Sequence, residues 1–260
     1  MSNHDDPYKG LGLVESYRGR IVDLLASLES ANQSNLMTAS KVMADRIADD
    51  HLIYVYGPGG HSNLAAQEVF FRAGGLMHIS AILDEGTLLS SGALRSMAIE
   101  RTPGYGRIVV ERSGIGDGDV LILVNAYGIN AALIDAALTA RQAGAYLIGV
   151  SSRRHADETA PDHPARHPSK KNLHDVVDLH IDSQVPVGDA VIDIDNVSQK
   201  TGPISTFANA FLMNSLVILT ISELANRGID PPIWRSGNAP GGDQANETHI
   251  DDFVGRIKWL

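Results

Sequence analysis

Two continuous apolar runs, separated by one helical segment, most constrain the fold of this 260-residue chain. The runs are VLILVNA at 120–126 and AYLIGVSS at 145–152, and the segment between them, 130–144, is helical in pattern and ends at Gly144. Strands without a polar face are buried on both sides, as in parallel sheets. A strand, a helix and a strand at this spacing predict a βαβ unit, and therefore an α/β fold with a parallel sheet.

The same alternation continues on both sides of this unit. Further strands are predicted at 51–57, 76–83, 176–182 and 189–195. Further helices are predicted at 63–73, 88–100 and 203–227, and the apolar spacing predicts two N-terminal helices, 11–31 and 36–49, with a break at 32–35. The segment 104–119 is rich in turn residues, and 153–172 holds three prolines and is predicted to be a long polar loop.

No internal repeat and no linker divides the chain. We therefore expect one domain at 1–260, with a helical N-terminal segment at 1–50, a core at 51–227 and a C-terminal tail at 228–260.

Charge and composition exclude several classes of function. The chain has 21 Lys and Arg against 31 Asp and Glu, a net charge of −10, and an acidic surface repels nucleic acid. It has no cysteine, which excludes disulfides, thiol nucleophiles and thiolate zinc sites. The first ten residues, MSNHDDPYKG, lack the apolar run of a signal peptide, and the most apolar stretch, 207–225, contains Asn209, Asn214 and Glu223. We expect a cytoplasmic protein with no membrane span.

A glycine-rich turn, YVYGPGGHSN at 54–63, joins the first predicted strand to a helix. Such a turn directs backbone N–H groups and a helix N-terminus at one place, which suits an anion. The dinucleotide fingerprint fails because Ser62 stands where a third glycine is needed, and a P-loop is excluded because no lysine lies between Lys41 and Lys170. Two interpretations remain: a sugar-phosphate turn in which His61 and Ser62 contact the ligand, or a tight turn with Ser62 as helix cap.

The stretch YGPGGHSNLAAQEVFFRAGG at 56–75 resembles the first glycine turn of the sugar isomerase (SIS) domain family. It is most similar to an uncharacterised bacterial subfamily described as phosphosugar-binding or phosphoheptose-isomerase-like. The resemblance continues at 166–192, 199–211 and 236–243. It implies a flavodoxin-like three-layer αβα sandwich with a five-stranded parallel sheet, on which the N-terminal helices pack. It also implies a homo-oligomer, dimer or tetramer, and a sugar phosphate or related carbohydrate derivative as ligand, with no cofactor and no metal.

A second loop departs from the family pattern. SIS domains carry Ser-x-Ser-Gly-x-Thr/Asn after a middle strand to hold the phosphate of the sugar, and the matching stretch here is NAYGIN at 125–130. Gly128 and Asn130 match, whereas Asn125 and Tyr127 replace the serines. An asparagine amide can donate to a phosphate oxygen. A tyrosine hydroxyl reaches several ångströms further from the backbone than a serine hydroxyl, so it would place a phosphate elsewhere, or its ring would fill the site.

Isomerisation of an aldose to a ketose requires a base that carries a proton between C1 and C2. Glu68 lies six residues after Ser62, about 9 Å along the following helix, and the resemblance implies a glutamate on that helix. The alternative for Glu68 is an ion pair with Arg72, four residues on. His61 is the expected second group, in ring opening or orientation, because histidine titrates near neutrality. The leading hypothesis is a cytoplasmic isomerase that works through an enediolate, and the alternative is a non-catalytic sugar-phosphate sensor.

Other polar residues complete the predicted site. His155, His163 and His167 share a proline-containing polar loop, which aligns them poorly for a metal, and HPSKK at 167–171 is a cationic segment that either closes over an anionic substrate or stays solvated. The residues expected to contact the substrate are Gly59, Gly60, Ser62, Asn125, Tyr127, Gly128, Asn130, Ser151, Ser152, His167, Lys171, Ser205 and Thr206.

Overall fold

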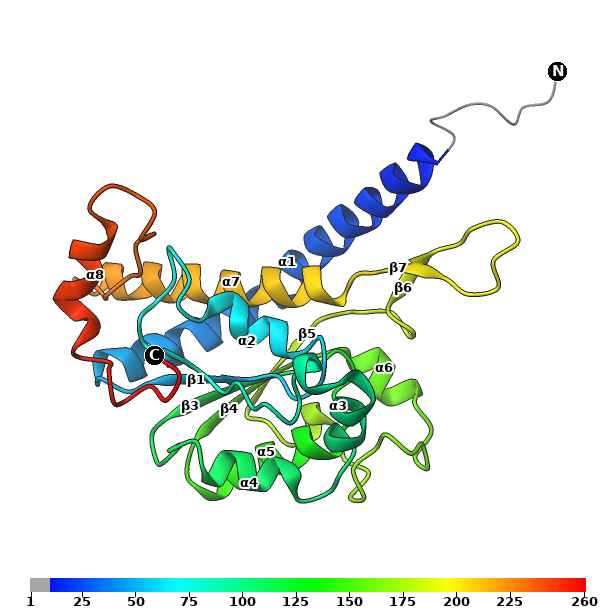
Figure 1. Ribbon diagram of the computed structural model, residues 1–260, viewed down its shortest axis with the longest axis horizontal. Coiled ribbons are helices and arrows are strands. Elements are labelled where there is room, and N and C mark those ends of the chain that lie inside the picture. The colour runs from blue at the N-terminus through cyan, green and yellow to red at the C-terminus, as the bar shows by residue number, and fades with distance from the viewer. Residues whose placement is uncertain (1–9) are drawn as a thin grey trace.

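A computed structural model describes residues 10–260, so all of MSNHDDPYKG except Gly10 lies outside the described residues. The core is a five-stranded parallel sheet in the order β2-β1-β3-β4-β5, with helices on both faces (Figure 1). The strands are β1 (Ile53–Tyr56), β2 (Ile79–Ala81), β3 (Val120–Val124), β4 (Tyr146–Ser151) and β5 (Leu179–Asp182). This sheet confirms the fold class that the apolar runs and the resemblance predict.

The helices and a small second sheet complete the chain. The helices are α1 (Leu11–Ala48), α2 (Asn63–Val69), α3 (Ala93–Glu100), α4 (Tyr105–Glu111), α5 (Ala131–Gln142), α6 (Arg153–Glu158), α7 (Ser205–Asn226) and α8 (Gly242–Ile250). The short strands β6 (Ala190–Ile192) and β7 (Thr201–Pro203) pair antiparallel, and single 3₁₀ turns lie at Leu89–Ser91 and Leu173–Asp175.

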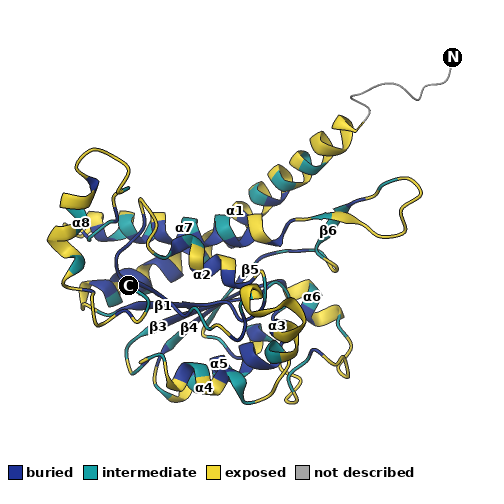
Figure 2. Cartoon of the chain, viewed as in Figure 1, coloured by how far each residue is buried: buried dark blue, intermediate teal, exposed yellow. Residues whose placement is uncertain are grey.

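Successive residues of the central strands serve two different cores. In β3, Ile122 and Val124 pack under α1, α2 and α7, whereas Leu121 and Leu123 pack against α4, α5 and the C-terminal segment. This division follows from the alternation of side chains across a strand, and it explains why all five residues of β3 are apolar and buried. Figure 2 shows the sheet as the buried centre of the chain.

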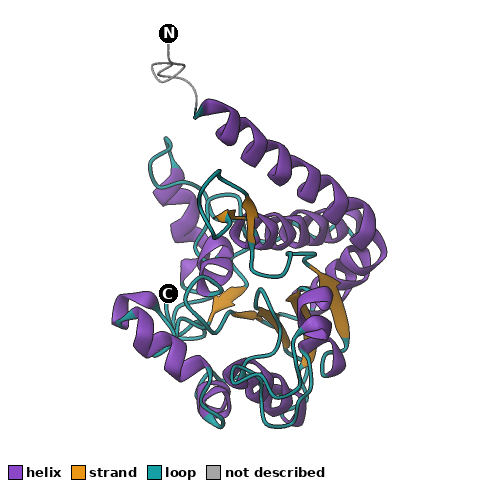
Figure 3. Cartoon of the chain, turned by 90° about the vertical axis from the view of Figure 1, so that its right-hand side faces the viewer, coloured by secondary structure: helices purple, strands orange, loops and turns teal. Residues whose placement is uncertain are grey.

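The predicted break at 32–35 is wrong, because α1 is one continuous helix of 38 residues. The two asparagines that predicted the break instead fasten α1 to the edge strand β5. Asn32 is buried, and its Nδ2 donates to Leu28 O and Asp182 O, each at 3.0 Å, while its Oδ1 accepts from Asp182 N at 3.0 Å. Asn35 Nδ2 donates to His180 O at 2.9 Å. Figure 3 shows the first turns of α1 projecting beyond the sheet.

Two other segments differ from their predictions. Within 104–119, Tyr105–Glu111 forms α4, because Gly106 lets it approach α5 so closely that a Cβ there would overlap Ala132 O. Within 153–172, the first six residues form α6, where the Ser152 hydroxyl accepts from His155 N as an N-cap.

The helix predicted at 63–73 ends earlier, at Val69, because the backbone is extended at Phe70 and left-handed at Phe71. The Phe71 ring lies 4.6 Å from that of Trp234, so the predicted tail packs beside this turn. Of the described helices, α7 alone is long and apolar enough to cross a membrane, and here it packs against α1 and α2 and contributes Leu212, Leu216 and other residues to the core.

We expect Asn32→Ala to lower the free energy of unfolding by roughly 1–3 kcal/mol, since it leaves the backbone groups of Asp182 without their partner. Urea unfolding followed by circular dichroism measures this change. Gln33→Ala, at the exposed neighbouring position, is the matched control. Equal effects of the two substitutions would contradict the role of Asn32 as the fastening between α1 and β5.

Candidate functional site

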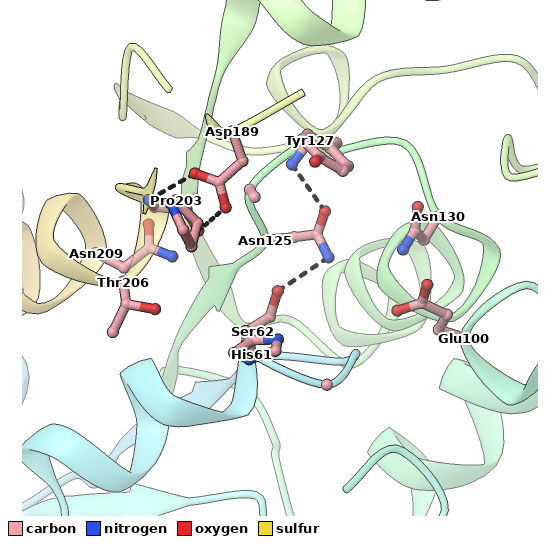
Figure 4. A pocket seen from close by; sticks show the side chains of 13 residues that line it. His61, Ser62, Glu100, Asn125, Tyr127, Asn130, Asp189, Pro203, Thr206 and Asn209 are labelled. Carbon is pink, nitrogen blue, oxygen red and sulfur yellow. Dashed lines mark hydrogen bonds between the residues drawn. The ribbon is translucent and has the colours of Figure 1, made fainter. Parts of the chain in front are cut away.

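A polar pocket of about 250 Å³ lies where the loops after β1 and β3 meet the start of α7. Ligands of parallel α/β sheets bind at this position, beyond the carboxyl ends of the strands. In Figure 4, Glu100 and Asn130 stand on one side of the pocket, Asp189, Thr206 and Asn209 stand on the other, and Asn125 lies between them. The lining residues are Gly60, His61, Ser62, Glu100, Asn125, Ala126, Tyr127, Asn130, Asp189, Pro203, Ser205, Thr206 and Asn209.

The glycine turn after β1 is packed by the protein itself. A Cβ at Gly57 would overlap Ser62 O, so the turn folds back on its own backbone. Gly59 has a φ of 116°, and a Cβ there would overlap Glu100 Oε2. A Cβ at Gly60 would meet the side chain of Leu89. The space that these glycines leave is therefore filled mainly by neighbouring protein atoms.

Asn125 joins the two loops of the pocket. Its Oδ1 accepts from Tyr127 N at 3.0 Å and from Gly128 N at 2.9 Å, while its Nδ2 donates to Pro58 O at 3.1 Å and to Ser62 Oγ at 3.3 Å. The two backbone N–H groups need an acceptor, which fixes the orientation of the amide. Both ends of this buried amide are thus engaged within the protein.

Asp189 occupies the start of α7. Its Oδ1 accepts from Ile204 N at 3.0 Å and from Ser205 N at 2.7 Å, and its Oδ2 accepts from Ser205 Oγ at 2.6 Å. The free N–H groups of a helix start attract negative charge, and Asp189 supplies it from a distant part of the chain. The predicted contact residue Ser205 therefore lines the pocket with its hydroxyl already donated to Asp189.

One turn further along α7, Asn209 faces the pocket. Its side-chain oxygen is fully buried and has no hydrogen-bond partner within residues 10–260. A buried acceptor without a donor is costly, so a turn of this amide that brings the oxygen to a ligand hydroxyl is favourable.

Glu100, the last residue of α3, is the most perturbed acid that lines the pocket. Burial raises its pKa to about 7, while the nearby Arg101 and a hydrogen bond with the Asn130 side chain act in the opposite direction. A carboxyl that titrates near neutrality can take up a proton and return it in one reaction cycle. Sequence reasoning placed Glu100 at the end of a helix, but no spacing pattern indicated that this end meets the glycine turn.

Tyr127 forms one wall of the pocket and stacks on His155, with ring centroids 3.6 Å apart and an interplanar angle of 17°. Burial raises the pKa of Tyr127 and lowers that of His155. The stack therefore joins two uncharged rings near neutral pH, and it anchors the loop after β3 to α6.

The predicted base Glu68 lies in an adjacent hollow, which also contacts His61, Thr206 and Asn209. Its Oε1 is 3.5 Å from Arg72 Nη2 and accepts from Asn214 Nδ2 at 3.1 Å. The ion pair with Arg72 that we considered from the sequence is thus present.

Several other residues of the predicted site lie outside the pocket. Ser151 is buried against Gly128 and is 3.0 Å from His180 Nε2, and Ser152 Oγ donates to Val185 O at 2.7 Å. His167 Nε2 lies 3.1 Å from Asp135 Oδ1.

The remaining loop residues are also apart from the pocket. Lys171 is exposed, and His163 Nδ1 accepts from Ala165 N. No group of three metal-ligating side chains gathers within residues 10–260. Conversely, Glu100, Asp189, Pro203 and Asn209 line the pocket although sequence reasoning did not select them.

Comparison with known proteins agrees with the fold. The SIS domain family matches residues 16–152, and the chain belongs to this family. A UPF0309 protein of Halalkalibacterium halodurans is 35% identical over 248 residues, which cover 95% of this chain and 97% of the relative. A UPF0309 protein of Streptomyces avermitilis is 32% identical over 247 residues, covering 94% of this chain and 96% of the relative.

Solved structures share the fold. A phosphoheptose isomerase of Francisella tularensis superposes with a TM-score of 0.53 at 14% identity, covering 82% of this chain and 98% of that one. A phosphoheptose isomerase of Neisseria gonorrhoeae gives a TM-score of 0.52 at 16% identity, covering 82% of this chain and 95% of that one.

We expect the stability of the chain to depend on pH through Glu100. Its pKa rises from 4.5 to about 7 on folding, so the folded chain binds more protons than the unfolded chain between these values. The contribution of Glu100 to stability is therefore most favourable below pH 4.5 and is lost as the pH rises to 7. In urea unfolding, Glu100→Gln should gain stability relative to the wild type at pH 8 and show little gain at pH 4. The exposed Glu247→Gln is the control, and a gain that is independent of pH would contradict the assignment.

Proposed function

We propose that this chain binds a carbohydrate derivative in the pocket and interconverts its aldose and ketose forms through an enediolate. The observation that carries the proposal is Glu100, a carboxyl with a pKa of about 7 in a pocket whose other polar groups are suited to sugar hydroxyls. The SIS family, and the fold shared with two phosphoheptose isomerases, support a substrate among sugar phosphates and related carbohydrate derivatives.

In the proposed reaction the Glu100 carboxylate removes the proton from C2 of the open-chain aldose. The electron pair of the broken C–H bond forms the C1–C2 double bond of the enediolate, and the carbonyl pair moves onto O1. The same carboxyl then returns the proton to C1 while the proton of the O2 hydroxyl passes to O1, so that C2 becomes the carbonyl carbon of the ketose. His61, which lines the pocket and is exposed to solvent, donates a proton to the ring oxygen or accepts one from the anomeric hydroxyl during opening. Ser62, Thr206 and Asn209 hold the hydroxyl groups.

Glu100 is preferred to Glu68 as the base on two grounds. Glu100 lines the pocket itself, and burial raises its pKa toward the range in which a carboxyl transfers protons efficiently. Glu68 is already engaged by Arg72 and Asn214 in the adjacent hollow. Because His61, Thr206 and Asn209 line both spaces, Glu68 remains near enough to serve a longer substrate.

Two further expectations stay predictions: a location in the cytoplasm and assembly into a dimer or tetramer. Sedimentation velocity on the purified chain measures the assembly directly.

The proposed reaction predicts exchange of the C2 proton with solvent. Incubation with C5–C7 aldoses and ketoses, free and phosphorylated, in D₂O should give deuterium at C2 in NMR spectra. We expect Glu100→Gln to slow exchange about 100- to 10,000-fold, the usual contribution of an acid–base group. We expect Glu68→Gln, the matched control, to retain most of the rate.

Each other outcome of this experiment identifies a different alternative. Loss of exchange in Glu68→Gln but not in Glu100→Gln would assign the base to Glu68. Sugar binding without exchange would indicate a non-catalytic sensor, which the altered loop at Asn125 and Tyr127 would explain.

A further inference from the structure

We infer that the pocket takes a sugar or polyol without a phosphate group, either neutral or bearing an amino group. The inference rests on the proposed function only in treating this pocket as the sugar site. Two places around the pocket attract anions by their backbone geometry. A protein oxygen already stands at each of them.

The first place is the loop after β3. The N–H groups of Tyr127 and Gly128 both donate to Asn125 Oδ1. A phosphate could use these donors only if the amide moved away, and that movement would also break its bonds to Pro58 O and Ser62 Oγ. Asn125 is only 4% exposed, so its hydrogen-bonding groups would then be left buried and unpaired.

The second place is the first turn of α7, where Asp189 accepts from two backbone N–H groups and one hydroxyl. Across the pocket from Asp189 stands a second acid, Glu100, beside Asn130 (Figure 4). Two carboxyls therefore border the pocket. Asp189, and Glu100 in its ionised form, repel a phosphate, and the repulsion of like charges is strong in a space that is partly shielded from water.

Cationic side chains do not offset these two acids. Among the lining residues, all of which lie in the described part of the chain, His61 is the one titratable base and none is Lys or Arg. The cationic segment HPSKK is not part of the lining, and its His167 lies 3.1 Å from Asp135 Oδ1.

The polar groups that remain match the hydroxyl groups of a sugar. Asn209 is 4% exposed, and its buried Oδ1 has no partner within residues 10–260. The amide of Asn209 offers an oxygen that accepts and an N–H₂ group that donates, so it suits a hydroxyl group, which does both. Ser62 Oγ accepts from Asn125 Nδ2, which leaves its own hydrogen for a ligand oxygen. A sugar hydroxyl both donates and accepts, so it satisfies either group.

The test compares each free sugar with its own phosphate. Titration calorimetry of the wild-type chain with glucose, fructose and glucosamine, and with their 6-phosphates, should favour the free member of each pair by about tenfold or more. Inorganic phosphate should not compete with the sugar. Tighter binding of the phosphorylated members, or competition by inorganic phosphate, would overturn the inference.

A gain-of-function variant tests the same point without any sugar. The double substitution Asn125→Ser and Tyr127→Ser releases the backbone N–H groups of the loop, so it should raise affinity for inorganic phosphate about tenfold or more in ³¹P NMR titrations. Asn226→Ser, at an exposed position at the end of α7, is the control. The inference would be overturned if the wild type bound inorganic phosphate with the same measurable affinity as the double variant. If the double variant does not fold, the wild type alone tests the inference, and measurable binding of inorganic phosphate in its pocket would overturn it.

The proposed isomerase activity and the inference of an unphosphorylated ligand are overturned by different results. Absence of C2 exchange with every sugar would overturn the proposed isomerase and leave the phosphate result standing. Exchange confined to sugar phosphates would support the isomerase and overturn the inference about its substrate.

Discussion

The site depends on one buried amide. The side chain of Asn125 accepts from two backbone N–H groups of its own loop and donates to a carbonyl and a hydroxyl of the glycine turn. The loops after β1 and β3 are thereby held in one relative position, which shapes the pocket between them. A serine is too short to span this distance on both sides, so the shape of this site follows from asparagine at 125.

The glycines of the turn after β1 make room for neighbouring protein atoms rather than for a ligand. Its glycines admit protein atoms: the Ser62 carbonyl at Gly57, the Glu100 carboxyl at Gly59 and the Leu89 side chain at Gly60. The carboxyl gains most from this arrangement, because close contact with the turn removes it from water and makes its protonation accessible near neutral pH. The turn is thus part of the environment that tunes an acid.

Local pattern predicted the parallel sheet and the position of both loops, because apolar runs and glycine turns are properties of short segments. It failed at 32–35, where side chains that break isolated helices are satisfied by a strand about 150 residues away. It also failed to select Glu100 and Asp189. Each reaches the pocket through a contact with a distant part of the chain. Glu100 contacts the glycine turn, and Asp189 contacts the start of α7. Such contacts leave no periodic signal in the sequence.

The asparagines of α1 also close an edge of the sheet. β5 is an outer strand, and the backbone groups of His180 and Asp182 that face away from β4 are taken by Asn35 and Asn32. At the opposite edge, the segment next to β2 donates from Met77 N to Pro232 O and forms a bridge from Leu76 to Ile233. An open strand edge is a template for uncontrolled pairing between chains. With the outer backbone groups of β5 occupied, a second copy cannot extend the sheet from that edge, and the chain is protected from aggregation by that route.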